Sequence, residues 1–285
     1  MRNSICQKQI RISDIILKLF IYLSAVISVG ILVGIIAYVA FRGISSVSWE
    51  FLSTVTSELN DTFGIIGNIV NTLYIIVISL LIATPVGIGA AVYLTEYAKP
   101  GKIVRIIEFT TETLAGIPSI IYGLFGMAFF GISFKLGTSI LCGCLTLTIM
   151  VLPLIIRTTQ ESLKTVPLGY RTGALGIGAT KWYMIRTIIL PSALPGIVTA
   201  VILSVGRIVG ESAALLFTAG AGYYLPKHLL SHAMKSGGTL TIQMYLSMER
   251  GEFDHAFGIA LVLVVIVLII NALTKIVTNS MKKSA

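Results

Sequence analysis

The sequence predicts an all-α integral membrane protein with six transmembrane helices. Hydrophobic residues make up 55% of its 285 residues and charged residues only 12%, with a mean hydropathy of +0.94, whereas soluble domains carry about 25% charged residues. Uncharged runs long enough to cross a ~30 Å hydrocarbon core as a helix recur six times. The alternating polarity of a membrane barrel is absent, so these continuous apolar runs favour helices.

Each uncharged run predicts one spanning helix. The six runs cover residues 19–41, 63–95, 113–134, 136–156, 187–206 and 256–274. The second is longer than one span needs, so its helix is expected to begin near Gly67 or Asn68. The third and fourth are joined only by a short turn at 135–137. Gly116 and Pro118 are expected to break the third helix near its start, either as a packing kink or to expose backbone groups to a permeation path.

The chain is expected to divide into two parts. Residues 1–62 hold the first helix and an outer loop, and residues 63–285 hold a five-helix core with a cytoplasmic loop over 157–187. The first apolar run has 23 residues and no small-residue cleavage site at its end, so it is interpreted as a retained helix rather than a signal peptide. No internal repeat is evident, which weakens the case for a secondary transporter built from inverted repeats.

Lysine and arginine predict the orientation. If the N-terminus is cytoplasmic, 15 of the 21 Lys and Arg residues fall on the inner side, as the positive-inside rule requires. Both termini are therefore expected in the cytoplasm. The net charge of +9 is then explained by the anionic cytoplasmic face of the lipid bilayer, and nucleic acid is not an expected partner.

The cysteines and histidines predict neither a disulfide framework nor a metal site. Cys6, Cys142 and Cys144 are interpreted as small packing residues. His228 and His232 lie four apart and could bind a metal as a pair, but no third ligand is evident. The favoured interpretation is an ordinary outer amphipathic segment.

One arginine and one glutamate, Arg207 and Glu211, interrupt an otherwise uncharged stretch. Residues four apart on a helix share a face, so the two side chains are expected to touch. A lone charge in lipid is costly, and intramembrane ionisable groups are candidates for function. Gly206 and Gly210 flank the pair and would let a helix or a ligand approach closely. The functional hypothesis is an anion site on the permeation path. The alternatives are a structural ion pair or two groups near the outer interface.

The cytoplasmic stretch from residue 157 to 195 predicts a short helix held by a glycine turn. Pro167 can begin a helix because its missing N–H costs nothing in the first turn, and the helix is expected over 168–175. Gly176 and Gly178 would permit a tight turn, after which a second helix from about Thr180 enters the membrane. The same pattern also fits an interfacial amphipathic helix.

The segment GALGIGATKWYMIRTIILPSALPGI, residues 173–197, resembles the cytoplasmic EAA loop of ABC importer permeases. Gly178 matches the glycine of that loop, and residues 188–191 match its I-x-L-P end. Thr172, Gly173 and Ala174 stand where E-A-A would be, so the glutamate of the family is missing. The resemblance implies a type I ABC importer permease fold, with a short helix that sits in a groove of a separate ATPase subunit.

The resemblance also implies which residues couple this chain to the ATPase. They are Pro167, Arg171, Thr172, Gly173, Ala174, Gly176, Gly178, Ala179 and Lys181. The chain has no G-x-x-x-x-G-K-[ST] motif to cradle phosphates. It is therefore expected to be a non-catalytic subunit without a cofactor of its own, and ATP and Mg would be bound by the partner ATPase.

Three segments resemble phosphate-importer permeases of the PstA type: GRIVGESAALLFTAG (206–220), TETLAGIPSIIYGLFG (111–126) and GATKW (178–182). The resemblance covers the chain from about residue 64 to 278. It implies transport of inorganic phosphate across the bacterial cytoplasmic membrane. It also implies a homologous PstC-type permease, a PstB-type ATPase dimer and an extracytoplasmic phosphate-binding protein as partners. In that family the arginine and glutamate at the positions of Arg207 and Glu211 are associated with transport.

The chemistry of the pair is compatible with phosphate. A guanidinium offers a planar fork of donors to an oxyanion, and a carboxylate can accept the proton that phosphate still carries near pH 7. Sulfate has no such proton. Importers of molybdate or sulfate with the same architecture remain alternatives, as does a secondary transporter or channel. On the outer side, Lys227, Lys235, Arg250, Glu249, Glu252 and Asp254 are expected to form a solvated face where a binding protein docks.

Overall fold

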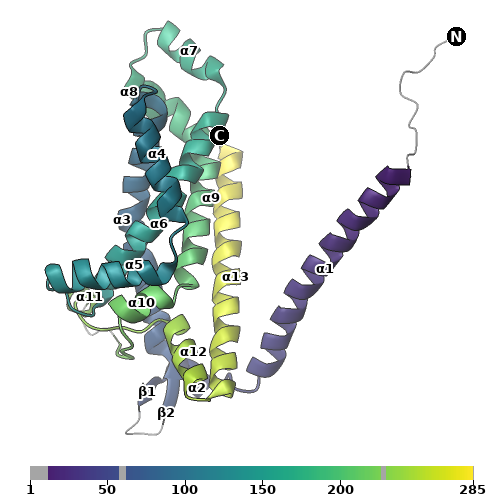
Figure 1. Cartoon of the computed structure of the whole chain (residues 1–285), viewed down its shortest axis with the longest axis vertical. Coiled ribbons are helices and arrows are strands. Elements are labelled where there is room, and N and C mark those ends of the chain that lie inside the picture. Colours follow the sequence, from purple (N-terminus) through teal and green to yellow (C-terminus); the bar gives the residue numbers. More distant parts are fainter. Residues whose placement is uncertain (1–11, 58–61, 226–228, 285) are drawn as a thin grey trace.

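The computed structural model describes residues 12–57, 62–225 and 229–284. In chain order the elements are α1 (Ile12–Gly43), α2 (Trp49–Ser53), β1 (Val55–Ser57), β2 (Thr62–Ile65), α3 (Ile66–Val92), the π-helical segment η1 (Tyr93–Tyr97), α4 (Lys102–Ala115), α5 (Ser119–Gly126), η2 (Met127–Ser133), α6 (Ile140–Thr165), α7 (Leu168–Gly176), α8 (Lys181–Met184), η3 (Ile185–Ile189), α9 (Leu190–Val209), α10 (Ala213–Thr218), α11 (Leu229–Ala233), α12 (Leu240–Glu249) and α13 (Phe253–Ser284). Long helices run side by side along the molecule (Figure 1), as the apolar runs predict.

Five continuous helical stretches are long and apolar enough to cross a membrane. They are Ser13–Gly43, Ile66–Tyr97, Ile140–Thr165, Lys181–Val209 and Phe253–Ile276. These stretches confirm five of the six expected spans. The α3 helix begins at Ile66, one residue before the expected start. The turn before α6 has positive φ at Lys135 and Gly137.

The third expected span is present as a bent pair of helices and not as one straight helix. The α4 helix already begins at Lys102, and α4 and the following pair α5–η2 are bent by 103° at the break between them. Gly116 caps α4 and Pro118 precedes α5, so the break itself falls where the sequence predicts it. The bent pair counts as the sixth crossing if it is taken as one span.

The bundle core lies where α3 packs against α6. Ile75, Leu147 and Met150 are fully buried there. The two helices come close at Gly87, where an added Cβ would meet Ile155. Cys144 donates to the carbonyl of Ile75 on α3, and Cys142, two residues earlier, donates to Gly126 on α5. Both thiols are buried and free, so their interpretation as packing residues is confirmed.

The α1 helix stands apart from the bundle over most of its length (Figure 1). It meets the rest of the chain at its C-terminal end, where Tyr38 packs edge-on against Phe257 of α13 at 5.7 Å. The expected boundary between residues 62 and 63 falls inside β2, which pairs with β1 through Val55 and Ile65.

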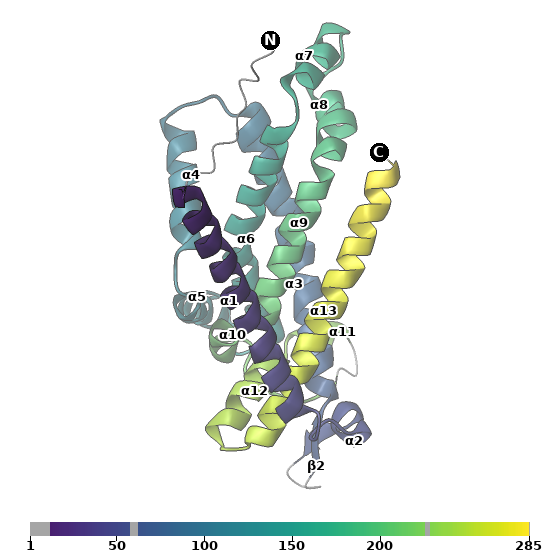
Figure 2. The same cartoon turned by 90° about the vertical axis from the view of Figure 1, so that its right-hand side faces the viewer.

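The two ends of the bundle differ in what they carry. In Figure 2, α7 and α8 lie at one end, toward which the N-terminal end of α1 and the C-terminal end of α13 also point. The opposite end carries α2, the two strands and α12.

Candidate functional site

Glu211 lies just beyond the end of α9 and bridges the short gap between α9 and α10 with a hydrogen bond. The α9 helix ends at Val209 with Gly210 as its cap. The Oε1 atom of Glu211 accepts a hydrogen bond from the backbone N–H of Ala214 at 3.0 Å, and its backbone carbonyl accepts one from the Thr241 hydroxyl at 2.9 Å. Glu211 is 9% exposed. One carboxylate oxygen is therefore used to hold the first turn of α10 in place.

Arg207 and Glu211 do not form the expected pair, because the helix ends before Glu211 and the i,i+4 geometry is lost. No ion pair within 4.0 Å joins them. Within the described part of the chain, the half-buried Arg207 side chain makes neither a hydrogen bond nor an ion pair. It lies within electrostatic range of Tyr122, whose hydroxyl donates to the carbonyl of Leu114 across the α4–α5 bend at 2.7 Å.

The glycines beside this pair face open space in this chain. An added Cβ at Gly206 would meet nothing within 4 Å, and one at Gly210 would meet only a backbone oxygen of its own helix. Together with Val209 and Thr241 they line an apolar groove of about 420 Å³ that also reaches Ile36 of α1. The close approach expected from these glycines is not made within the chain, and it stays a prediction about a ligand or a partner.

A buried polar network beside Glu211 was missed by the sequence reasoning. The Asn68 amide donates to the carbonyl of Gly238 at 3.0 Å, and the Asn71 carbonyl oxygen lies 2.7 Å from Nε2 of His232. The network reaches Glu211 through Thr239 and Thr241, whose hydroxyls are 2.9 Å apart. The available signal was two asparagines three residues apart inside an uncharged run, which places both on one helix face.

His232 lies on the buried side of an amphipathic segment, because Ser231, Met234 and Lys235 around it are exposed. The residue is 3% exposed and is bonded to Asn71 of α3, which is far away in sequence. His228 and Lys227 lie outside the described residues. Among the residues that the structure places, no three His, Cys, Asp or Glu side chains gather as a metal site would require.

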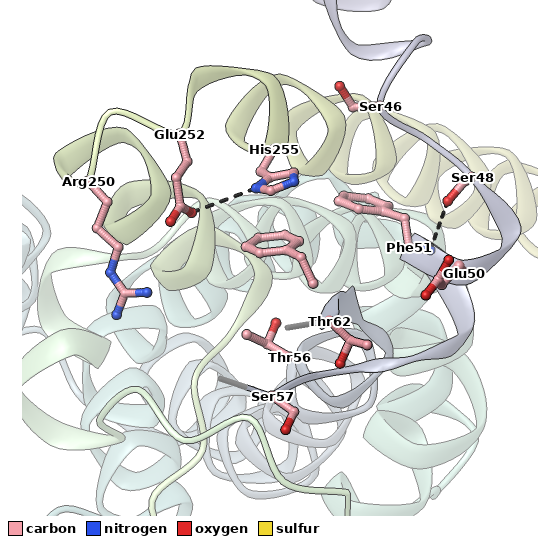
Figure 3. A pocket seen from close by; sticks show the side chains of 11 residues that line it. Ser46, Ser48, Glu50, Phe51, Thr56, Ser57, Thr62, Arg250, Glu252 and His255 are labelled. Carbon is pink, nitrogen blue, oxygen red and sulfur yellow. Dashed lines mark hydrogen bonds and ion pairs between the residues drawn. The ribbon is translucent and has the colours of Figure 1, made fainter. Parts of the chain in front are cut away.

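The end of the bundle opposite α7 contains a cleft of about 450 Å³. Figure 3 shows its lining: hydroxyl side chains and Glu50 from the α2–β2 region, and Arg250, Glu252 and His255 from the turn between α12 and α13. Glu252 lies 3.7 Å from Nδ1 of His255, whose ring stacks on Phe63 at 3.8 Å. Lys235, Glu249, Arg250 and Asp254 of the expected solvated face are exposed, and Glu252 is half-buried.

The short helix predicted in the α7 loop is present. Pro167 is the N-cap of α7, and the helix runs from Leu168 to Gly176. Gly178 has φ of +86°, a left-handed conformation that a Cβ disfavours. Gly176 is instead the last residue of the helix and is not among the glycines with positive φ. The turn thus needs Gly178, whereas the expected role of Gly176 was wrong.

The expected coupling residues divide into an exposed and an attached set. Thr172 and Gly173 are exposed, and Ala174 is the one α7 residue that is buried, at 5% exposure. Ala179 is half-buried against the same apolar cluster. Ile177 is 87% exposed. One face of α7 is thus exposed in the described part of the chain, and Ala174 is the only side chain of the helix that is buried.

Arg171 and Lys181 point back to the end of α3. Arg171 forms an ion pair with Glu96 at 2.8 Å, and Nζ of Lys181 lies 4.9 Å from the centre of the Tyr97 ring. Glu96 was not singled out by the sequence reasoning. It is the first charged residue after the second uncharged run, but nothing in the sequence pairs it with a residue 75 positions later.

The comparisons with known proteins concern the family and the fold of the chain. Residues 83–283 match the family of binding-protein-dependent transport system inner membrane components. The chain is 38% identical over 198 residues to the probable ABC transporter permease protein YqgI of Bacillus subtilis, covering 70% of this chain and 67% of that relative. It is 31% identical over 265 residues to the phosphate transport system permease protein PstA 1 of Mycobacterium tuberculosis, covering 92% and 87%.

A solved structure shows the same fold. A chain of a bacterial alginate ABC transporter, in complex with a periplasmic protein bound to an alginate pentasaccharide, superposes with a TM-score of 0.67. The match covers 93% of this chain and 96% of that one, at 16% sequence identity. The likeness at this identity concerns the arrangement of helices and not the substrate.

Proposed function

The chain belongs to the family of binding-protein-dependent transport system inner membrane components, and we propose that it is the permease subunit of an ATP-driven importer of inorganic phosphate. It is a multi-pass membrane subunit and not an enzyme. The observation that carries the substrate assignment is the half-buried Arg207, which makes neither a hydrogen bond nor an ion pair to a described residue, four positions before a carboxylate that is fixed in place.

An unpaired guanidinium in an apolar helix bundle is costly unless water or an anion meets it. Arg207 lies two residues before the end of α9 and within electrostatic range of Tyr122, which lies on α5 just after the bend where the helix is interrupted. A guanidinium binds oxyanions through two parallel N–H donors. Arg207 is therefore assigned the role of holding the phosphate oxygens as the anion passes.

Glu211 selects the protonated anion in this proposal. Its Oε1 is held by the Ala214 N–H, so the carboxylate keeps its position while Oε2 accepts the O–H of phosphate. Sulfate offers no proton and would leave the carboxylate facing a second negative charge. The name of the Mycobacterium tuberculosis relative, a phosphate transport permease, supports the same substrate, and importers of sulfate or molybdate are the competing assignment.

Glu211→Gln is the sharpest test of this assignment. Glutamine keeps a carbonyl oxygen that can accept the hydrogen bond from the Ala214 N–H, so the connection between α9 and α10 is preserved. It replaces Oε2 with an NH2 group, which is a hydrogen-bond donor. In vesicles that contain the importer with all its subunits, phosphate uptake is expected to fall and sulfate uptake to appear. Normal phosphate uptake, or no gain of sulfate uptake, would overturn the role of Glu211. The unaltered importer is measured with phosphate, sulfate and molybdate in competition to decide the substrate itself.

The exposed face of α7 would receive the ATPase. Its exposed residues, with Gly178 fixing the following turn, fit a helix that docks in a groove of a PstB-type subunit, where ATP and Mg are bound. A homologous PstC-type permease would complete the path, and an extracytoplasmic phosphate-binding protein would dock at the opposite end, near the cleft of Figure 3. The α7 end would then be cytoplasmic, together with both termini, in the bacterial cytoplasmic membrane. Antibody or protease access to a tag on either terminus tests this orientation.

A further inference from the structure

Arg171 joins three elements through one guanidinium. Its Nε and Nη2 donate to the Glu96 carboxylate, with Nε 3.1 Å from Oε1 and 3.4 Å from Oε2, and Nη2 2.8 Å from Oε1. Nη1 donates to the carbonyl of Val166 at 2.7 Å, and Nη2 also donates to the carbonyl of Leu163 at 2.8 Å. Glu96 belongs to η1 at the end of α3, and the two carbonyls belong to the end of α6. The α7 helix is thereby fixed to both central helices of the bundle.

The ion pair between Arg171 and Glu96 is buried, unlike the other ion pairs between charged side chains in the described part of the chain. The side chains of Arg171 and Glu96 are 17% and 5% exposed. In the pair between Arg157 and Glu112 the corresponding values are 45% and 55%. Exposed pairs contribute little, whereas removing one partner of a buried pair leaves an uncompensated charge. The carbonyls of Leu163 and Val166 are end groups of α6 that need a donor in any case.

Little else holds α7 to the bundle. Ala174 is its only buried residue, and it sits in a small apolar cluster with Val92 of α3 and Leu163 of α6. Alanine offers a small contact area, so this packing alone allows the helix to slide or tilt. The guanidinium is planar and forms several directed bonds at once, so it fixes the direction of the helix as well as its position.

The pair of Arg171 and Glu96 also lies where the backbone departs from regular α-helical geometry. Glu96 is in the π-helical segment η1, and η3 follows α8 on the other side of the loop. Lys181, at the start of α8, lies over the ring of Tyr97 in η1. Single π-helical turns are frequent at functional sites. The α7 helix, through Arg171, and the start of α8, through Lys181, are therefore attached to the same short segment, Tyr93–Tyr97.

We propose that Glu96 and Arg171 are positioning residues that transmit the motion of α7 into α3 and α6. The inference rests on the proposed function, in which a separate ATPase moves α7. With the pair intact, α7 and the end of α3 move as one body. Without it, α7 stays joined to α6 through the chain at Val166 and Pro167, and the end of α3 no longer follows.

The first test measures coupling. Glu96→Gln in the complete importer, reconstituted in vesicles with its ATPase and binding protein, is expected to keep ATP hydrolysis within about twofold while phosphate uptake per ATP falls about tenfold. Arg171→Lys, which can meet Glu96 but cannot also bridge both carbonyls, is expected to give an intermediate ratio. Glu112→Gln removes the exposed pair with Arg157 and serves as the control, with an unchanged ratio.

The second test does not depend on the substrate. Spin labels at Tyr93→Cys and Leu175→Cys, both exposed positions, in a chain carrying Cys6→Ser report the distance between η1 and α7 in the complex with and without ATP. One narrow distance in both states is expected for the otherwise unaltered chain, and a broadened distribution for Glu96→Gln.

The two tests separate the failure of this proposal from the failure of the proposed function. An importer that takes up no phosphate refutes the substrate, while the distance measurement still decides the role of the pair. An unchanged uptake ratio in Glu96→Gln with an unchanged distance distribution overturns the proposal. The proposal is also overturned if Glu96→Gln lowers the yield of complex, ATP hydrolysis and phosphate uptake together, with uptake per ATP unchanged. The pair would then serve folding alone.

Discussion

The carboxylate of Glu211 is bonded to the backbone N–H of Ala214 at 3.0 Å, and not to Arg207. The bond spans the break between α9 and α10, because α9 ends at Val209. The consequence is an asymmetric pair of charges. Glu211 is fixed by the fold, whereas Arg207 is left free to meet an anion, so the two residues respond differently to substitution.

Arg207→Gln is expected to abolish most transport while leaving the fold intact. The substitution removes the charge but no hydrogen bond or ion pair to any described residue, so the free energy of unfolding should not decrease. Phosphate uptake by the complete importer should fall at least about tenfold, because charge-assisted bonds are the strong ones. Arg207→Lys keeps the charge without the planar fork and should lie between the two. Uptake at the normal rate in Arg207→Gln would remove the physical basis of the anion site.

Gly123→Ala is expected to disturb the position of Glu211 from a distance. A Cβ at Gly123 of α5 would lie 2.8 Å from Cα and 3.1 Å from the carbonyl oxygen of Ala214, which are backbone atoms that cannot rotate away. Overpacking of this kind costs about 1–3 kcal/mol and moves the N–H that holds Glu211. The melting temperature in detergent and the rate of phosphate uptake should both fall.

The control for that experiment is Gly89→Ala in α3. A Cβ there meets nothing within 4 Å, and alanine favours a helix over glycine by about 1 kcal/mol. Its melting temperature should be unchanged or higher. Equal effects of the two substitutions would show that the contact between α5 and α10 is not tight.

Gly178→Ala is expected to weaken the turn after α7. The φ of +86° costs an L-residue about 1–2 kcal/mol, although there is space for the Cβ. ATP-driven uptake should fall while the amount of folded chain stays normal. Gly137→Ala, which puts a comparable positive φ of +58° on an alanine without neighbours within 4 Å in the turn before α6, should leave uptake closer to normal. Normal uptake with Gly178→Ala would show that the turn is not used in coupling.

His232 is expected to make stability depend on pH. Burial, and secondarily the charge of Lys235, lowers the pKa of His232 from 6.5. A histidine that stays neutral in the fold but takes up a proton when unfolded contributes stability above pH ~6.5, which is lost as the pH falls toward the lowered pKa. The melting temperature of the purified chain should therefore fall as the pH is lowered from about 7 to 5. In His232→Gln, which keeps a polar partner for Asn71, this decline should be smaller, and an identical pH profile would contradict the assignment.

The sequence by itself determined the helices and the turn chemistry of this protein. A helix in a bilayer must satisfy its own backbone hydrogen bonds, so runs of apolar residues fix spanning helices locally. For the same reason Pro167 at the start of α7, Gly178 in the turn and the break at Gly116 and Pro118 could be read without knowing the fold, because each is a property of one residue's own backbone.

Only the tertiary structure decided which side chains meet. Glu211 was expected to pair with Arg207 four residues away. Because α9 ends at Val209, its carboxylate instead accepts a hydrogen bond from the backbone N–H of Ala214. His232 and Asn71, and likewise Arg171 and Glu96, come from elements that are distant in the chain, and the packing of α3 against α6 and the following loops brings them together. The 103° bend between α4 and α5 is also set by packing: a proline and a glycine permit a break, but Tyr122, bonded back to Leu114, and the contact of α5 with α10 set its direction.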